Sequence, residues 1–383
     1  MALAAWIGLT QLLFVTTWTL YVVYLPQLAA QAGIPKHWLP WILVADQLVF
    51  ALTDVLTGFW LDRVRAGLAR IGPWMLGVTV LSCAAFLLLP FAGASSGVLL
   101  GAITVWAVTS AALRSPPWVL LSRHAAMPRI PWLSTLALTG TAVGSALAPY
   151  LGVALRGVDP RIPFILSSLT LVATVAGLVA AERRRSGEAG SSEPQPAQTL
   201  PPSRLFLALL FLALGIQVHY SLNSTSRYLQ FASPAELVYL MPVFWVGFNL
   251  LMFVAVRLVR RIGPGDAMAL AAACGAIATL AAAVATNLPV LLAAQFLAGG
   301  CWGAALVAAY TAAVALGRTG REGRFLGTLF AVLAAAVALR IATVATGAER
   351  EPAVSALLPW LPEAAWLAAA LLLLVAVRAS RRG

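Results

Sequence analysis

A short block of residues occurs twice, separated by about half of the 383-residue chain. Arg70-Ile71-Gly72-Pro73 returns as Arg261-Ile262-Gly263-Pro264, and Cys83 and Cys274 have the same separation. Each copy of the block ends a basic loop and begins a long apolar segment. A shared separation of this kind indicates an internal duplication, so we expect two related halves that meet near the middle of the chain.

The composition is that of a membrane protein. The chain is 61% hydrophobic and 10% charged, whereas soluble domains are about half apolar and about a quarter charged. The net charge of +12 does not indicate nucleic-acid binding, because the arginines form short clusters between apolar segments rather than one basic stripe. The three cysteines lie inside apolar segments and predict neither disulfides nor a metal site. We interpret the first apolar segment as a retained span, not a signal peptide.

Apolar segments of the length that crosses a bilayer number twelve. They lie at about 4–30, 39–61, 73–91, 98–121, 132–154, 163–181, 205–230, 236–256, 267–285, 289–316, 325–347 and 360–377. The sequence therefore predicts an all-α membrane protein with two six-helix bundles related by a pseudo-twofold axis. The N-terminal bundle is residues 1–181, a cytoplasmic linker is 182–204, and the C-terminal bundle is 205–383.

The distribution of basic residues predicts the orientation. If both termini lie on one side, most of the 25 lysines and arginines fall in loops on that side. The opposite loops hold Lys36, Arg156, Arg161 and Arg350. Because cytoplasmic loops carry an excess of Lys and Arg, we expect both termini to be cytoplasmic, in the plasma (inner) membrane. We also expect a monomer.

A motif at the end of the second span resembles a known family. Gly58-Phe-Trp-Leu-Asp62-Arg63 is similar to the loop motif of the major facilitator superfamily, although Val64 and Arg65 displace the Gly that follows it there. The resemblance implies a secondary transporter that works by alternating access, with its solute site between the halves. It assigns gating roles to Gly58, Asp62 and Arg63: the glycine permits close helix approach, and the charges act as a latch. The other interpretation of Asp62 and Arg63 is a surface pair of little energetic value.

Three further motifs resemble a narrower group, the glycoside–pentoside–hexuronide:cation symporters that include melibiose permease. Asp54-Val-Leu-Thr-Gly58 is similar to that group's second-helix motif, with Val in place of Pro. Arg70-Ile-Gly-Pro-Trp74 resembles the start of its third helix, and Pro117-Trp-Val-Leu-Leu121 resembles its fourth-helix motif. Phe50 stands where the group has a second acid, so a proton is expected as the coupling ion rather than sodium.

Several charged side chains fall inside predicted spans, where an ionised group costs at least about 2.5–3.5 kcal/mol unless it is paired or hydrated. These are Asp46, Asp54, Arg114, Arg227 and Arg340. At a rise of ~1.5 Å per residue, Asp54 and Arg114 lie at similar depths of roughly 20 and 24 Å. Either they form a pair near the solute site in which Asp54 accepts the coupling proton, or they form a permanent buried pair that orders the bundle.

The intramembrane arginines outnumber the acids, and Arg binds carboxylates and phosphates through paired hydrogen bonds. We therefore predict a small polar solute with an anionic group, held by Arg340 and Arg114 from opposite bundles; the other interpretation is that Arg227 and Arg340 snorkel or bind carbonyls. The other predicted solute contacts come from polar positions in the seventh span and from tryptophans: Gln217, Tyr220, Trp118 and Trp302. Asp46 and His219 are further candidates for the coupling proton, although a lone His on a polar face is more often only hydrogen-bonded.

Other classes of function fit the sequence less well. None of the three histidines pairs with cysteines or acids at metal or acid–base spacing, and no Gly-Lys-Ser/Thr phosphate loop occurs, so we predict neither an enzyme nor an ATP-driven pump, and no cofactor. Proton-antiport export of amphipathic compounds is an alternative to symport, favoured by a stripe of small residues, Gly140, Gly144, Ala148 and Gly152, which ordinary helix packing also explains. A non-transporting sensor or assembly factor is an alternative from another class.

Overall fold

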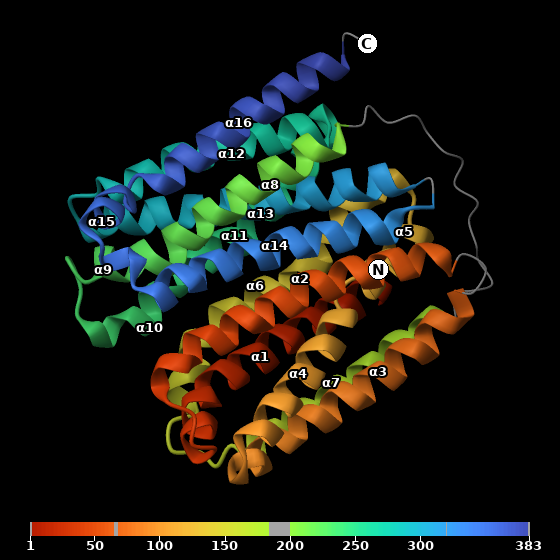
Figure 1. The fold of residues 1–383 in the computed structure, drawn as a ribbon. Coiled ribbons are helices and arrows are strands. Elements are labelled where there is room, and N and C mark those ends of the chain that lie inside the picture. Colours follow the sequence, from red (N-terminus) through yellow and green to blue (C-terminus); the bar gives the residue numbers. More distant parts are fainter. Residues whose placement is uncertain (1, 65–67, 184–199, 319, 382–383) are drawn as a thin grey trace.

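The computed structural model describes residues 2–64, 68–183, 200–318 and 320–381. These residues form two helical bundles, one built from α1 to α7 and the other from α8 to α16 (Figure 1). Both termini lie at the same end of the molecule, called here the termini-bearing end (Figure 1). Twelve helices among the described residues are long and apolar enough to cross a membrane. The prediction of twelve spans is therefore confirmed.

The first bundle contains seven α-helices because one span is broken. Its helices are α1 (Ala2–Gln31), α2 (Leu39–Arg63), α3 (Leu68–Leu88), α4 (Ser96–Ala112), α5 (Pro116–His124), α6 (Ile130–Ala154) and α7 (Arg161–Arg183). The span predicted at 98–121 consists of α4 and α5, which are interrupted at residues 113–115. Pro116 and Pro117 explain the break, since proline lacks the N–H that a continuous helix requires and clashes with the preceding turn.

The second bundle also has a modified span. Its helices are α8 (Pro202–Val218), α9 (Ser224–Tyr228), α10 (Leu237–Leu240), α11 (Pro242–Ile262), α12 (Pro264–Ala283), α13 (Leu288–Gly317), α14 (Glu322–Thr346), α15 (Pro352–Leu357) and α16 (Leu361–Ser380). A π-helical segment, His219–Asn223, joins α8 to α9. π-Helical segments inside α-helices are frequent at functional sites. Most of the predicted linker, 182–204, lies outside the described residues; its first two residues belong to α7 and its last three to α8.

The repeated block occupies equivalent places in the two bundles, although its backbone differs. Pro73 lies in the first turns of α3, whereas Gly263 precedes α12 with a φ of 85°. That conformation favours glycine. The first-copy glycine, Gly72, is helical, and a Cβ there would lie 2.9 Å from Cγ1 of Val179. The same sequence block thus begins the third span of each bundle. Its glycine is required by backbone conformation in the second copy and by close packing in the first.

The most extensive contacts between the bundles are those of α2 with α14 and of α6 with α11. The first two glycines of the small-residue stripe in the fifth span face the first bundle instead. A Cβ at Gly140 would overlap the backbone of Gly8, and one at Gly144 would lie 3.0 Å from Val15. These two glycines therefore pack α6 against α1 inside the first bundle, as close helix packing predicts, whereas a Cβ at Gly152 would meet no atom within 4 Å.

Candidate functional site

The break between α4 and α5 places Arg114 beside Asp54 of α2. The Nη1 atom of Arg114 lies 3.0 Å from Oδ2 of Asp54, and the carboxylate side chain is fully buried. The equal depths predicted for these residues are thus reflected in direct contact. The contact lacks the angles of a hydrogen bond, and among the described residues neither carboxylate oxygen accepts one. Asp54 is therefore a buried carboxylate whose charge is balanced by a single guanidinium.

Arg114 also contacts both bundles. Its guanidinium lies 5.5 Å from the ring centre of Phe50 on α2 and 5.0 Å from that of Phe330 on α14. Cation–π contacts of this kind contribute about 0.5–2 kcal/mol each. The contact with Phe330 depends on how the bundles are arranged, so the surroundings of the Asp54–Arg114 pair change when the bundles move apart.

An aromatic stack closes the space next to this pair. The ring of Trp118, on α5, stacks on that of Tyr310, on α13, at 4.1 Å and 16°. Phe330 meets both rings edge-on, and Trp118 is only 2% exposed. Trp118 was predicted to contact solute. In this conformation it instead packs between the bundles, where solute could reach it only after the stack separates.

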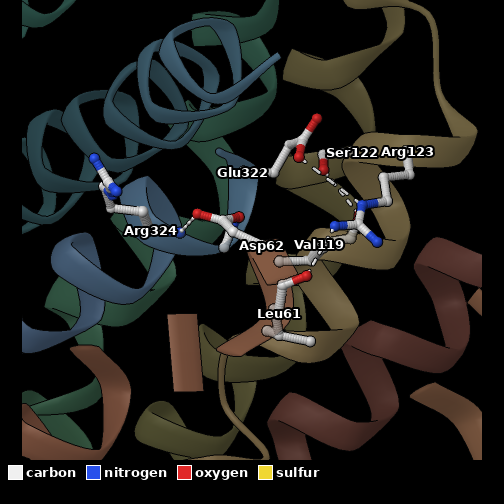
Figure 2. A network of polar contacts seen from close by, with 8 residues as sticks. Leu61, Asp62, Val119, Ser122, Arg123, Glu322 and Arg324 are labelled. Carbon is white, nitrogen blue, oxygen red and sulfur yellow. Dashed lines mark hydrogen bonds and ion pairs between the residues drawn. The ribbon is translucent and has the colours of Figure 1, made fainter. Parts of the chain in front are cut away.

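The predicted latch residue Asp62 caps the first turn of α14 in the other bundle. Its Oδ1 accepts a hydrogen bond from the N–H of Gly323 at 2.7 Å, and Oδ2 accepts one from the N–H of Arg324 at 3.0 Å. Figure 2 shows the carboxylate directed at this turn. A carboxylate at a helix N-terminus is stabilised by unpaired N–H groups and by the helix dipole. This geometry favours the latch over an idle surface pair. Arg63 is exposed and lies beside Asp62.

Gly58 sits where α2 crosses α14 most closely. A Cβ at this position would overlap the carbonyl oxygen of Gly323 and lie 3.3 Å from Cα of Gly327. Cβ atoms at Gly323 and Gly327 would in turn overlap the carbonyl oxygens of Gly58 and Asp54. Three glycines from two bundles therefore allow backbone-to-backbone contact, in agreement with the close approach predicted for Gly58.

Further polar contacts between the bundles lie at the same end of the molecule. Arg123 of α5 lies 3.9 Å from Glu322 of α14, and within its own bundle it also donates to the carbonyl of Leu61 at 3.2 Å (Figure 2). Arg318 donates to the carbonyl of Ala125 at 2.7 Å, and Arg260 donates to the carbonyl of Pro128 at 2.9 Å. These contacts close the termini-bearing end. Sequence reasoning missed these arginines because they look like ordinary basic loop residues.

Arg340 lies elsewhere on α14, in the part of the helix distant from the termini-bearing end. Its Nε donates to Oε1 of Gln217 on α8 at 3.3 Å. Within the described ranges it has no carboxylate partner. Phe330, which contacts Arg114, is separated from Arg340 by about 15 Å along α14 at ~1.5 Å per residue. In this conformation the two arginines do not converge on one small anion.

The other predicted site residues lie inside one bundle or the other. Asp46 accepts a hydrogen bond from the Tyr21 hydroxyl at 2.7 Å in the first bundle. In the second bundle, Nε2 of His219 lies 3.0 Å from Oε1 of Gln295, and Trp302 is buried with its ring 6.3 Å from that of Trp366. Tyr220 is half-buried against Phe244 and Trp245. The structure therefore separates Asp54, Arg114 and Trp118 from the remaining candidates.

Arg227 has the carbonyl partners that one interpretation of the sequence predicted. Its guanidinium donates to the carbonyls of Ala282 and Ala285 at 3.3 and 2.8 Å, where α12 ends. A cation at a helix C-terminus is favourably placed. No group of three or more His, Cys, Asp or Glu able to hold a metal ion occurs among the residues that the structure describes.

Comparison with known families decides the class of protein. The sequence matches the family model described as Major Facilitator Superfamily over residues 7–341. The chain belongs to this superfamily. It is therefore an integral membrane protein and a secondary transporter by family, not an enzyme. No curated protein matches the chain in a sequence comparison.

Solved structures of the same fold cover nearly the whole chain. The human organic anion transporter MFSD10 (TETRAN) matches with a TM-score of 0.72 and 16% identity, covering 99% of each chain. A bacterial homologue of the iron transporter ferroportin, in an outward-facing state, matches at 0.75 and 14%, covering 98% of this chain and 99% of its own. The E. coli fucose:proton symporter FucP matches at 0.68 and 15%, covering 100% and 99%. At these identities the matches establish the fold alone.

Proposed function

We propose that this transporter carries a small polar solute with an anionic group and that Arg340 binds that group. The observation that carries the proposal is that Arg340 lies within a membrane-spanning helix, half-buried, with a single neutral hydrogen-bond partner, Gln217, among the described residues. A guanidinium in that setting keeps donors available for a carboxylate or phosphate. Tyr220, next to Gln217 along the helix, supplies a polar and aromatic surface.

We further propose that Asp54 carries the coupling proton. A buried carboxylate that loses its only cationic partner is strongly destabilised unless it takes up a proton. Arg114 belongs to the same bundle as Asp54, but its contact with Phe330 crosses to the other bundle. Opening the termini-bearing end removes Phe330 and uncovers the α2–α14 crossing, so that Arg114 can turn toward water and leave Asp54. The protonation of Asp54 is thereby linked to the arrangement of the bundles, which is what coupled alternating access requires. Asp46, already bonded to Tyr21, and His219, bonded inside one bundle, are weaker candidates.

The narrower sequence resemblance supports one direction of transport over the other. The second, third and fourth spans resemble the melibiose permease group, so we propose symport and entry of the solute. In the stripe that suggested an exporter, Gly140 and Gly144 pack α6 on α1, which is ordinary helix packing and favours neither direction. We also propose that the termini-bearing end is cytoplasmic, as the arginine distribution predicts.

A thermal-shift comparison with matched solutes tests the anionic preference. Purified protein is heated with pairs that differ by one anionic group, such as glucose and glucuronate or glycerol and glycerol phosphate. A solute that binds the native state raises the melting temperature by mass action, and we expect this only from anionic members.

The matched variants are Arg340→Gln and Arg227→Gln. Loss of a charge-assisted hydrogen bond costs about 1.5–3 kcal/mol, which is roughly a 10- to 150-fold loss of affinity. Arg340→Gln should lose the shift, and Arg227→Gln should keep it, because that guanidinium is already bonded to carbonyls. Equal shifts with neutral solutes, or an unchanged shift in Arg340→Gln, would refute the anionic solute.

A further inference from the structure

A hollow of about 480 Å³ opens at the termini-bearing end, where the two bundles meet. Phe59, Asp62 and Arg63 line it from the first bundle, and Gly320, Arg321 and Arg324 line it from the second. Its volume is that of a small-ligand site. None of the roles discussed above, in solute binding or in coupling, uses this hollow.

The charge of the hollow is strongly positive. Arg63, Arg321 and Arg324 are all exposed, and no acid pairs with any of them among the residues described. The one acid in the lining, Asp62, already accepts hydrogen bonds from two backbone N–H groups of α14. The Arg324 side chain extends away from that carboxylate (Figure 2). Three guanidinium groups therefore remain available for an anion, and Arg forms paired hydrogen bonds with phosphate.

The hollow also opens beside an apolar surface. Arg63 ends α2 and the arginines of the second bundle surround the start of α14, so the hollow lies where two membrane-spanning helices end. Leu52, Leu56 and Phe59 follow one face of α2 up to the hollow and are 62, 58 and 41% exposed. Arg324 lies over the ring of Phe59 at 4.7 Å. Along α2, an apolar face that could contact acyl chains is thus followed by arginines that could contact a headgroup. This is the order of the layers of a phospholipid at the membrane boundary.

We propose that the hollow binds the phosphate headgroup of an anionic phospholipid. The bound lipid also stabilises the conformation in which the termini-bearing end is closed, because residues of both bundles form the hollow and it is lost when they separate. A ligand that binds one of two conformations shifts the population toward it. This inference does not depend on the solute or on the coupling ion proposed above.

The binding test uses full-length protein in neutral detergent and three probes: dioctanoylphosphatidylglycerol, dioctanoylphosphatidylcholine and inorganic phosphate. Only the phosphatidylglycerol should raise the melting temperature. Each arginine near an anionic headgroup contributes about fivefold to affinity, so Arg63→Gln/Arg321→Gln/Arg324→Gln should weaken binding by about 100-fold.

The control variant carries three other arginines changed to glutamine, all exposed near the same end and without an ion-pair partner among the described residues: Arg257, Arg261 and Arg378. This variant should keep the shift. No shift in the natural protein, or equal loss in both variants, would overturn the site. An equal shift with inorganic phosphate would overturn the lipid as its occupant.

Hydrogen exchange tests the conformational part. The amides of Gly323 and Arg324 are bonded to Asp62 only while the bundles touch. Nanodiscs of phosphatidylcholine with added phosphatidylglycerol should slow exchange in this first turn of α14 severalfold relative to phosphatidylcholine alone. The triple variant should show no such slowing. Phosphatidylglycerol that binds without changing exchange would overturn the stabilising role and leave the headgroup site intact.

Discussion

Replacing Gly58 by alanine should drive the termini-bearing end open without disturbing the helix itself. Alanine is the better helix former by about 1 kcal/mol, so α2 gains rather than loses intrinsic stability. The new Cβ, however, would overlap the carbonyl oxygen of Gly323 and lie 3.0 Å from its carbonyl carbon. Both atoms belong to the backbone of the opposite bundle, so no side-chain rotation relieves the clash.

The size of the effect follows from the cost of overpacking. An extra carbon in a close-packed interface typically costs about 1–3 kcal/mol. Because the clash exists only when α2 and α14 touch, this cost falls on the closed conformation alone. At about 1.4 kcal/mol per factor of ten, the ratio of open to closed molecules should rise roughly 5- to 150-fold.

Spin-label distances measure this shift. The labels replace Arg183 of α7 and Arg378 of α16, which are exposed on opposite bundles, after the three cysteines have been changed to serine. Gly77→Ala is the matched control, since a Cβ there meets no atom within 4 Å. Longer distances should appear in Gly58→Ala and not in the control. Identical distance distributions in the two variants would refute the role assigned to the α2–α14 crossing.

Two further changes test individual contacts. Asp62→Ala removes the carboxylate that caps α14, which should cost the closed conformation about 1 kcal/mol and raise the ratio of open to closed molecules roughly fivefold. The same spin labels should therefore report a larger fraction of long distances. An unchanged distance distribution would make Asp62 a surface residue. Arg227→Ala leaves the carbonyls at the end of α12 without their donors and should destabilise the protein by about 1–3 kcal/mol. A melting curve measures this loss of stability, and Arg350→Ala is the control because that side chain is 86% exposed. Equal melting temperatures for Arg227→Ala and Arg350→Ala would contradict the capping role.

Regular geometry explains which parts of the site the sequence predicts. The constant rise of a helix fixes relative depth, which is why Asp54 and Arg114 could be matched before their contact was known. The spacing of Gly58 and Asp62 on α2 similarly indicates a helix face that approaches a neighbour. Such inferences require only the position of a residue along its own helix. They do not require knowing which helix packs against it.

Partners that are backbone atoms leave no mark in the sequence. Asp62 binds amides of Gly323 and Arg324, and Arg227 binds carbonyls, so no residue pattern could identify the acceptor or donor. Periodicity also cannot separate a face inside one bundle from a face between bundles. The polar faces of the seventh span, for example, gave no indication that His219 contacts Gln295 inside its own bundle. The break before α5 could have been predicted from the pair Pro116-Pro117. The span predicted at 98–121 was nevertheless continuous across these two residues.

Proton uptake in proteoliposomes tests the central claim, that Asp54 couples the proton to the movement of the bundles. With a solute that passes the thermal-shift comparison, the natural protein should acidify the lumen as measured by a trapped pH-sensitive dye. Asp54→Asn should abolish this acidification while still exchanging labelled for unlabelled solute. Full solute-driven proton uptake by Asp54→Asn would contradict the account.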